Sequence, residues 1–300
     1  MKRSKLEQPK TLTYAQPAQI TMQTAARKLK ALLEHSIKES VSDSEETAVA
    51  FSGGLDSTII AHLAKKTCAN IQLIHVSLEN QPETIQAQKT AKELNLPIHV
   101  RTYKEADVEK TLPQVLWLIE DDDPMQASIS IPIFWTAQSA AELNARVMLA
   151  GQGADECFGG YKRYVDEYLS HGAECARKRI LHDIDELHET VVKRDHKICN
   201  YHNVELRLPF AAYKIVQFAS SLPLSLKIEP EENTPRKLVL RQVAKLLGLP
   251  ESTAQKPKKA MQYATGVDKA LKRLARKEGT TMKAYVHRTF SKLRRRNDNL

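Results

Sequence analysis

Two short glycine-containing segments of the sequence carry side chains that could act on a phosphate group. SGGLDS (52–57) follows a strand-like apolar run, and GQGADE (151–156) follows another. Glycines let the backbone approach an anion closely. The N–H groups of such a loop, together with the hydroxyls of Ser52 and Ser57, can donate to phosphate oxygens. The pattern GxxxxGK[ST] does not occur in the chain, which excludes a Walker-type NTPase.

Asp56 is unusual in a phosphate-binding loop, because a carboxylate repels phosphates unless a cation lies between them. One interpretation is a Mg²⁺ ion that Asp56 shares with the phosphates and with Asp155 of the second segment. The alternative is that Asp56 only caps the helix that follows, since aspartate is a good N-cap residue. The residues alone leave both interpretations open.

The elements around these segments predict an α/β fold. Apolar runs predict strands at 47–51, 71–78, 97–103 and 146–150. Helical periodicity predicts helices at 21–41, 56–66, 82–95, 105–120, 131–144, 162–170, 173–193, 211–221, 234–247 and 259–277. Strands that alternate with helices predict a parallel sheet with helices on both faces.

The order of the elements also predicts where a ligand binds. In open parallel sheets, ligands bind beyond the C-terminal strand ends, where the strand order reverses. The long two-helix segment before the strand at 146–150 places this reversal between that strand and the one at 47–51. The two glycine segments would then emerge side by side.

We expect one domain over residues 20–300, with a polar extension at 1–19. Its expected parts are an α/β core at about 20–165, a helical cap at about 166–280 and a basic tail at about 281–300.

Longer motifs around the two segments resemble a known family. SGGLDS after an apolar strand resembles the pyrophosphate-binding loop of the adenine nucleotide alpha-hydrolase-like (PP-loop) ATP pyrophosphatases. GQGADECFGGYKRY (151–164) is similar to the synthetase domain of glutamine-dependent asparagine synthetases. Three further stretches resemble the same domain: SISIPIFWTAQSAAE (128–142), RDHKICNYHNVELRLPF (194–210) and QKPKKAMQYATGV (255–267).

This resemblance implies a reaction that uses ATP and Mg²⁺ and forms AMP and pyrophosphate. In that family a small-molecule carboxylate, most often aspartate, attacks the α-phosphate, and ammonia then displaces AMP to give an amide. Lys258 aligns with the family's catalytic lysine, with Lys259 or Lys256 as alternatives of register. Asp56 and Asp155 are the expected Mg²⁺ ligands, and Asp56 and Gln152 are also expected at the catalytic centre.

The resemblance also implies binding residues. Nucleotide contacts are expected at Phe51, Ser52, Gly53, Gly54, Leu55, Asp56, Ser57, Val76, Ala150 and Gly151. Substrate contacts are expected at Gly153, Glu156, Glu205, Arg207 and Lys259. Structural alternatives stay open: Phe51 and Val76 also suit a core, Glu205 and Arg207 also suit an ion pair, and any lysine of the basic segment also suits the surface.

The sequence departs from the family pattern at three places. Gln152 replaces a glutamate implicated in forming the acyl-AMP, which keeps the hydrogen bonding of the side chain but not its charge. PFAAY (209–213) replaces Pro-Phe-Leu-Asp and loses a carboxylate. No glutaminase domain with an N-terminal cysteine is expected, so ammonia would come from solution or from a separate glutaminase subunit.

Three functional hypotheses follow from these observations. The first is an amide-forming ligase that resembles asparagine synthetase and uses ammonia. The second keeps the adenylation but changes the substrate to another carboxylate or to a tRNA-linked one. The third is a non-catalytic ATP-binding subunit that pairs with a glutaminase.

Composition limits the partners and the location. The net charge is +9, and residues 256–300 contain 14 basic and 3 acidic residues, which leaves nucleic acid open as a partner. A solvated helix with a frayed tail is the simpler interpretation of that segment. The four cysteines include no CxxC pair, which argues against a zinc site. We expect a cytoplasmic protein without a membrane helix or secretory signal, and a homodimer stays open.

Overall fold

A five-stranded parallel sheet organises the chain in the computed structural model, which describes residues 19–68, 70–256 and 259–297. Its strands are β1 (Glu46–Ala50), β2 (Asn70–Leu78), β3 (Ile98–Tyr103), β4 (Val147–Leu149) and β5 (Glu205–Arg207). The order is β3-β2-β1-β4-β5, and every neighbouring pair is parallel. The α/β class, the four predicted strands and the reversal between β1 and β4 are therefore confirmed.

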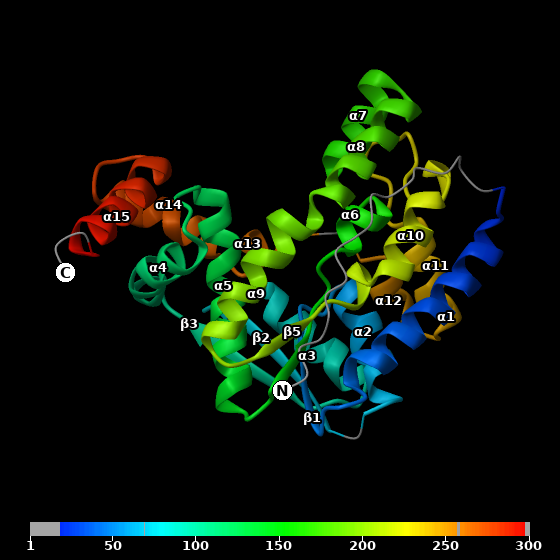
Figure 1. Ribbon diagram of the computed structural model, residues 1–300, viewed down its shortest axis with the longest axis horizontal. Coiled ribbons are helices and arrows are strands. Elements are labelled where there is room, and N and C mark those ends of the chain that lie inside the picture. Colours follow the sequence, from blue (N-terminus) through cyan, green and yellow to red (C-terminus); the bar gives the residue numbers. More distant parts are fainter. Residues whose placement is uncertain (1–18, 69, 257–258, 298–300) are drawn as a thin grey trace.

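Helices cover both faces of the sheet, because strand residues alternate between two hydrophobic clusters. Val49 and Leu149 pack into one cluster, and their neighbours Ala48 and Met148 pack into the other. The first cluster includes α1 (Met22–Val41), α2 (Leu55–Lys65) and α3 (Pro82–Glu93). The second includes α4 (Glu105–Ile119), α5 (Pro124–Glu142), α9 (Lys193–Tyr201), α14 (Val267–Lys277) and α15 (Met282–Asn297). Figure 1 shows α14 and α15 beside α4, on the opposite side of the molecule from α1 and α11 (Leu238–Leu246).

Shorter elements connect these layers. After β4 come α6 (Ala154–Phe158), α7 (Lys162–His171), α8 (Ala173–Asp185) and the π-helix η1 (His188–Val192). After β5 come η2 (Pro209–Ala211), α10 (Tyr213–Ser221), η3 (Leu224–Leu226), α11 (Leu238–Leu246), α12 (Glu251–Ala254) and α13 (Met261–Ala264). Within the described ranges, no helix combines the length and the hydrophobicity needed to cross a bilayer.

Some elements differ from the sequence prediction. No strand was expected at β5, a three-residue edge strand in which Leu206 lies between two charged residues. Helix α5 begins at Pro124 rather than at 131, because the carboxylate of Asp123 accepts hydrogen bonds from the N–H groups of Met125 and Gln126 at 2.7 and 2.9 Å. The helix predicted at 173–193 is interrupted by the π-turn of η1.

The basic C-terminal segment packs against the second face. Tyr285 and Val286 of α15 are buried in that cluster. Glu105 at the start of α4 accepts from Arg273 and Lys277 of α14 at 2.5 and 2.6 Å. Part of the positive charge in this segment therefore faces carboxylates of the same chain.

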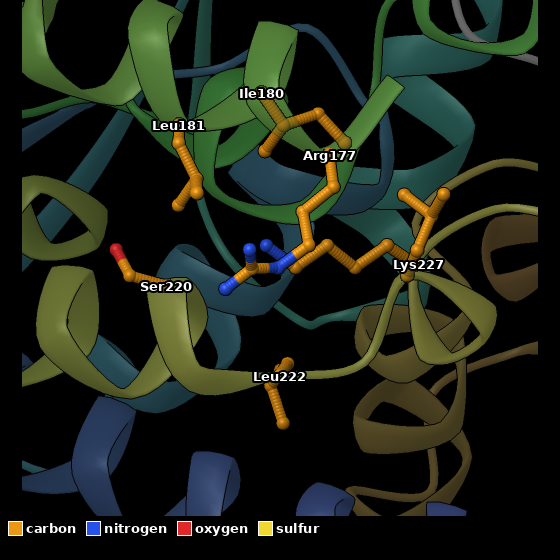
Figure 2. Close-up of a pocket in the computed structure, with 7 residues that line it drawn as sticks. Arg177, Ile180, Leu181, Ser220, Leu222 and Lys227 are labelled. Carbon is orange, nitrogen blue, oxygen red and sulfur yellow. The ribbon is translucent and has the colours of Figure 1, made fainter. Parts of the chain in front are cut away.

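A small cavity between α8 and α10 contains a buried lysine. Its volume is about 10 Å³, roughly the space that one water molecule occupies. Figure 2 shows the ends of the Arg177 and Lys227 side chains next to each other at this cavity. Burial lowers the pKa of Lys227 from 10.5 to about 8, and the charge of Arg177 adds to this effect. An ammonium group here therefore opposes folding.

We expect Lys227→Met to stabilise the protein near pH 7. The pKa of Lys227 is lower in the folded state than in the unfolded state. Below pH 8 the Lys227 ammonium is therefore charged in both states, and the loss of its hydration opposes folding. Between pH 8 and 10.5 the unfolded chain binds more protons, so wild-type stability rises relative to the variant, by about 3 kcal/mol in all. Chemical denaturation of the wild type and of Lys227→Met from pH 7 to 10.5 measures the difference between their free energies of unfolding. Lys245→Met, at an exposed lysine of α11, is the control, and a constant difference from pH 7 to 10.5 would contradict the prediction.

Candidate active site

The end of β1 fixes the entrance to the first glycine loop. The N–H of Phe51 donates to Ile74 O at 2.8 Å, which extends the pairing with β2. His75 Nδ1 donates to Phe51 O at 2.9 Å, so Nε2 accepts from the hydroxyl of Thr84 at 3.2 Å. Burial lowers the pKa of His75, which agrees with this neutral tautomer. The buried His75 imidazole thus connects the start of the first glycine loop to α3.

The SGGLDS segment forms a tight turn into α2. Gly53 has a φ of 63°, and a Cβ atom there would lie 2.8 Å from Ala87 Cα of α3. Only glycine fits this position, because the turn needs both the left-handed backbone and the close approach. The N–H of Ser52 donates to Ser57 Oγ at 3.2 Å, and the N–H of Gly54 donates to Ser52 Oγ at 3.3 Å. The loop is therefore closed by hydrogen bonds to its own hydroxyls, and hydroxyls are groups that can also donate to phosphate oxygens.

Asp56 is not the cap of α2. The helix begins at Leu55, and Gly54 is its N-cap residue, so Asp56 lies inside the first turn. The capping alternative raised from the sequence is therefore not what the structure shows. Gly151 lies against Asp56, since a Cβ atom at Gly151 would be 3.1 Å from Asp56 Cβ. The two glycine segments meet at this point.

Lys237 links the two predicted Mg²⁺ ligands. Its ammonium lies 2.6 Å from Asp56 Oδ2 and 2.7 Å from Asp155 Oδ1, and only 4% of its side chain is exposed. Burial alone lowers the pKa of Lys237, but Asp155 and Asp56 outweigh burial and raise it above the ordinary value. Gly160 leaves room for this arrangement, because a Cβ atom there would overlap the Asp155 carboxylate. Sequence reasoning missed Lys237.

The two carboxylates fit a divalent cation. Mg²⁺ is usually bound by one or two carboxylates together with substrate phosphates. Asp56 Oδ1 is buried and has no hydrogen-bond donor among the described residues. No group of three or more His, Cys, Asp or Glu side chains suited to a metal occurs within the described ranges, so any ion here would need the phosphates as further ligands. The Lys237 ammonium marks the place where positive charge is stabilised.

The lysine-rich segment after α12 reaches the first loop. Lys256 Nζ donates to Gly53 O at 3.0 Å, and Lys259 pairs with Glu83 at the start of α3. Burial lowers the pKa of Lys256, and Glu83 partly opposes this. Lys258, the predicted catalytic lysine, lies outside the described residues. Lys256 thus contacts SGGLDS itself, and Lys259 contacts the start of α3, the helix that packs against Gly53.

Three other predicted site residues have side-chain partners outside the two glycine segments. Arg207 donates to Asp43 and to Ser40 O, both near the end of α1, and Glu205 pairs with the same guanidinium. The two side chains form the ion pair that the sequence leaves open, while the Arg207 carbonyl accepts from the N–H of Ala150 at 3.2 Å, directly before the second glycine segment. Glu156 is 5% exposed and accepts from the hydroxyl of Tyr161 at 2.6 Å. Burial and then Asp155 raise the pKa of Glu156.

Four of the predicted nucleotide contacts are core residues. Phe51, Leu55, Val76 and Ala150 are 3%, 7%, 6% and 1% exposed. Their side chains pack in the two hydrophobic clusters, and the backbones of Phe51 and Ala150 lead directly into the two loops. These positions can shape a nucleotide site only through their backbone and the small exposed parts of their side chains.

The second glycine segment carries a polar link to α9. Gly153, with a φ of 91°, packs against Ala211 of PFAAY, where a Cβ atom would lie 3.2 Å from the Ala211 nitrogen. Gln152 Nε2 donates to Asp195 Oδ2 at 2.9 Å. Asp195 is fully buried and also accepts from Arg194 at 2.7 Å. Burial raises the pKa of Asp195, and Arg194 and Gln152 oppose this in turn.

Comparison with known proteins adds to this geometry. The family model for asparagine synthase matches residues 28–179 and 168–295. The chain belongs to the asparagine synthase family. A Methanocaldococcus jannaschii protein named as a candidate glutamine-hydrolysing asparagine synthetase is 33% identical over 280 residues, 84% of this chain and 51% of that protein. The glutamine-hydrolysing asparagine synthetase of Brassica oleracea is 30% identical over 207 residues, 64% of this chain and 34% of that protein.

These relatives of the asparagine synthase family are longer than the matched region. The chain spans about half of the length of the archaeal relative and a third of the plant one. Among solved structures, the NMN synthetase from Francisella tularensis overlaps 92% of this chain and 94% of its own, at 14% identity and a TM-score of 0.42. The family resemblance inferred from the motifs is confirmed by the family match.

Proposed function

We propose that the protein is an ATP-dependent amide ligase that adenylates a carboxylate and transfers ammonia to it. Aspartate is the first candidate, by similarity to the named relatives. One carboxylate oxygen forms a bond to the α-phosphorus of ATP while the bond to pyrophosphate breaks. Ammonia then forms a bond to the acyl carbon, loses a proton and displaces AMP. The products are an amide, AMP and pyrophosphate.

The observation that supports this proposal is the meeting of two acidic glycine loops at the β1–β4 reversal. Asp56 and Asp155 both contact the Lys237 ammonium there, and Lys256 contacts the first loop. This is the edge of a parallel sheet at which ligands bind. A loop without the Walker lysine, but with carboxylates and a separate lysine segment, suits a reaction that releases pyrophosphate.

Three groups of residues would have separate roles in this reaction. The N–H groups of the first loop and the hydroxyls of Ser52 and Ser57 would bind phosphate oxygens. Asp56 and Asp155 would hold Mg²⁺, which would neutralise charge on the leaving pyrophosphate. We propose Lys258 as the residue that stabilises charge at the α-phosphate, with Lys256 and Lys259 flanking it.

The test is ATP–pyrophosphate exchange with radiolabelled pyrophosphate, Mg²⁺ and a panel of carboxylates led by aspartate. We expect exchange that needs the carboxylate and Mg²⁺, and net AMP formation once ammonium is added. Exchange with a different carboxylate, or with a tRNA fraction, would keep the reaction and change the substrate. Absence of both exchange and AMP formation across the panel would refute a ligase and leave an ATP-binding subunit.

A further inference from the structure

The small cavity between α8 and α10 brings two positively charged side chains together. Arg177 belongs to α8, and Lys227 directly follows the short helix η3. Figure 2 shows the ends of the two side chains next to each other at the cavity. Lys227 is only 3% exposed, and Arg177 is partly exposed. Two like charges therefore lie close together where one of them has lost most of its water.

The Lys227 ammonium has no acidic counter-charge in the described part of the chain. Besides burial, the described groups that act on its pKa are Cys157 and Arg177. Burial raises the pKa of the Cys157 thiol to about 12, so this thiol is neutral at pH 7. Lys237 is buried to the same extent, but it lies between two carboxylates. Charges buried this deeply are normally paired, which points to a counter-charge from solution.

The walls of the cavity limit the size and the kind of ligand. The volume of about 10 Å³ holds one small spherical species and is too small for phosphate, sulfate or a nucleotide. Most of the wall is aliphatic, from Ile180, Leu181, Leu222 and Leu224. Because these side chains offer no hydrogen bonds, a strongly hydrated anion such as fluoride would lose more on entry than chloride. A water molecule also fits, but it brings no charge.

We propose that this cavity binds one small monovalent anion, of the size of chloride, as the counter-charge of Lys227. The ammonium has three N–H donors, and none of them is bonded to another of the described residues. Ser220 is the remaining polar residue of the wall, and its hydroxyl already donates to Val216 O at 2.9 Å. The ammonium is therefore the main donor to the anion. This site does not depend on the proposed ligase activity.

The anion site packs against both elements that bring Lys237 to Asp155. The carbonyl of Lys227 accepts from the N–H of Leu238 at 3.0 Å, and Leu238 directly follows Lys237. Gly159 ends α6, the helix that carries Asp155, and a Cβ atom at Gly159 would lie 3.3 Å from Lys227 Cβ. An anion that offsets the charge of Lys227 therefore stabilises the packing on which the carboxylate pair rests.

Urea denaturation at pH 7 in mixtures of sodium chloride and sodium gluconate tests the proposal at constant ionic strength. Gluconate is too large for the cavity. For one site on the folded chain, the equilibrium constant of unfolding falls about tenfold for each tenfold rise in chloride above the dissociation constant. We expect this dependence in the wild type and in Lys245→Met, and its loss in Lys227→Met. The gain in stability from Lys227→Met should therefore shrink as chloride rises.

Two results would overturn the proposal. One is equal stability of the wild type in chloride and in gluconate, which leaves water or a neutral amine in the cavity. The other is the same chloride dependence in the wild type and in Lys227→Met, which places the anion elsewhere. Neither measurement involves turnover, so a failure of the ligase reaction does not affect the result.

A second variant keeps both cations and tests the site even if Lys227→Met does not fold. Ser220→Glu places a carboxylate on the wall of the same cavity. We expect this variant to be more stable in gluconate than Ser220→Gln, which has the same shape without the charge, and to be insensitive to chloride. A Ser220→Glu protein that gains no stability over Ser220→Gln and responds to chloride like the wild type would contradict the proposal.

Discussion

Replacing Asp155 by asparagine is expected to lower the rate of carboxylate-dependent pyrophosphate exchange about a thousandfold. Asp155 is one of two carboxylates that contact the Lys237 ammonium at the β1–β4 reversal. Asparagine keeps the shape of the side chain but removes the charge that would hold Mg²⁺ against the phosphates. Asp56→Asn should have a similar effect, and the double variant should be little worse than either single one, because both act through one ion.

The measurement is initial exchange rate against Mg²⁺ concentration for each variant. We expect the loss to be only partly recovered at high Mg²⁺, since one ligand is missing. Asp166→Asn on α7 is the matched control, because Asp166 is an exposed aspartate that pairs with Lys162. Exchange in Asp155→Asn within tenfold of the wild type would show that this carboxylate does not serve the reaction.

Lys237→Met is expected to destabilise the nucleotide-free protein strongly. Removing the ammonium leaves Asp56 and Asp155 facing each other, and breaking a buried ion pair in this way costs about 3–5 kcal/mol. Mg²⁺ should then stabilise the variant more than it stabilises the wild type, because the ion no longer competes with an ammonium. Thermal unfolding with and without Mg²⁺ measures both effects.

The comparison with Lys245→Met controls for the loss of one positive charge at the surface. Exchange activity gives an independent readout of the same variant. A Lys237→Met protein that unfolds like the wild type and gains nothing further from Mg²⁺ would contradict the idea of a shared cation position. Destabilisation without any Mg²⁺ effect would reduce Lys237 to a structural ion pair.

The sheet could be predicted from the sequence because its strands are apolar runs separated by helical patterns. The meeting of Asp56 and Asp155 followed from the same reasoning, since β1 and β4 are parallel neighbours and their C-terminal ends share one edge. The strand β5 could not be predicted because three residues with charged ends give no periodic signal. The Glu205 and Arg207 side chains could not be placed without knowing that α1 ends beside them.

Lys237 could not be found from its surroundings in the sequence. It lies 181 residues from Asp56, and its position depends on a left-handed backbone at φ 60° just before α11. Nothing in TPRKLVLRQ (234–242) distinguishes this lysine from the many basic residues nearby. The sequence marks Gln152 as a departure from the family pattern but does not indicate its partner Asp195, because their contact joins two separate elements of the fold.

The contact between Gln152 and Asp195 gives an electrostatic reason for a glutamine, rather than a glutamate, at position 152. The buried space shared by residues 152 and 195 accommodates a single negative charge, which here belongs to Asp195. A second carboxylate at 152 would repel the first at hydrogen-bonding distance, and one of the two would have to take up a proton. Positions 152 and 195 therefore share one negative charge, and in a chain of this fold with carboxylates at both positions one of the two should carry a proton.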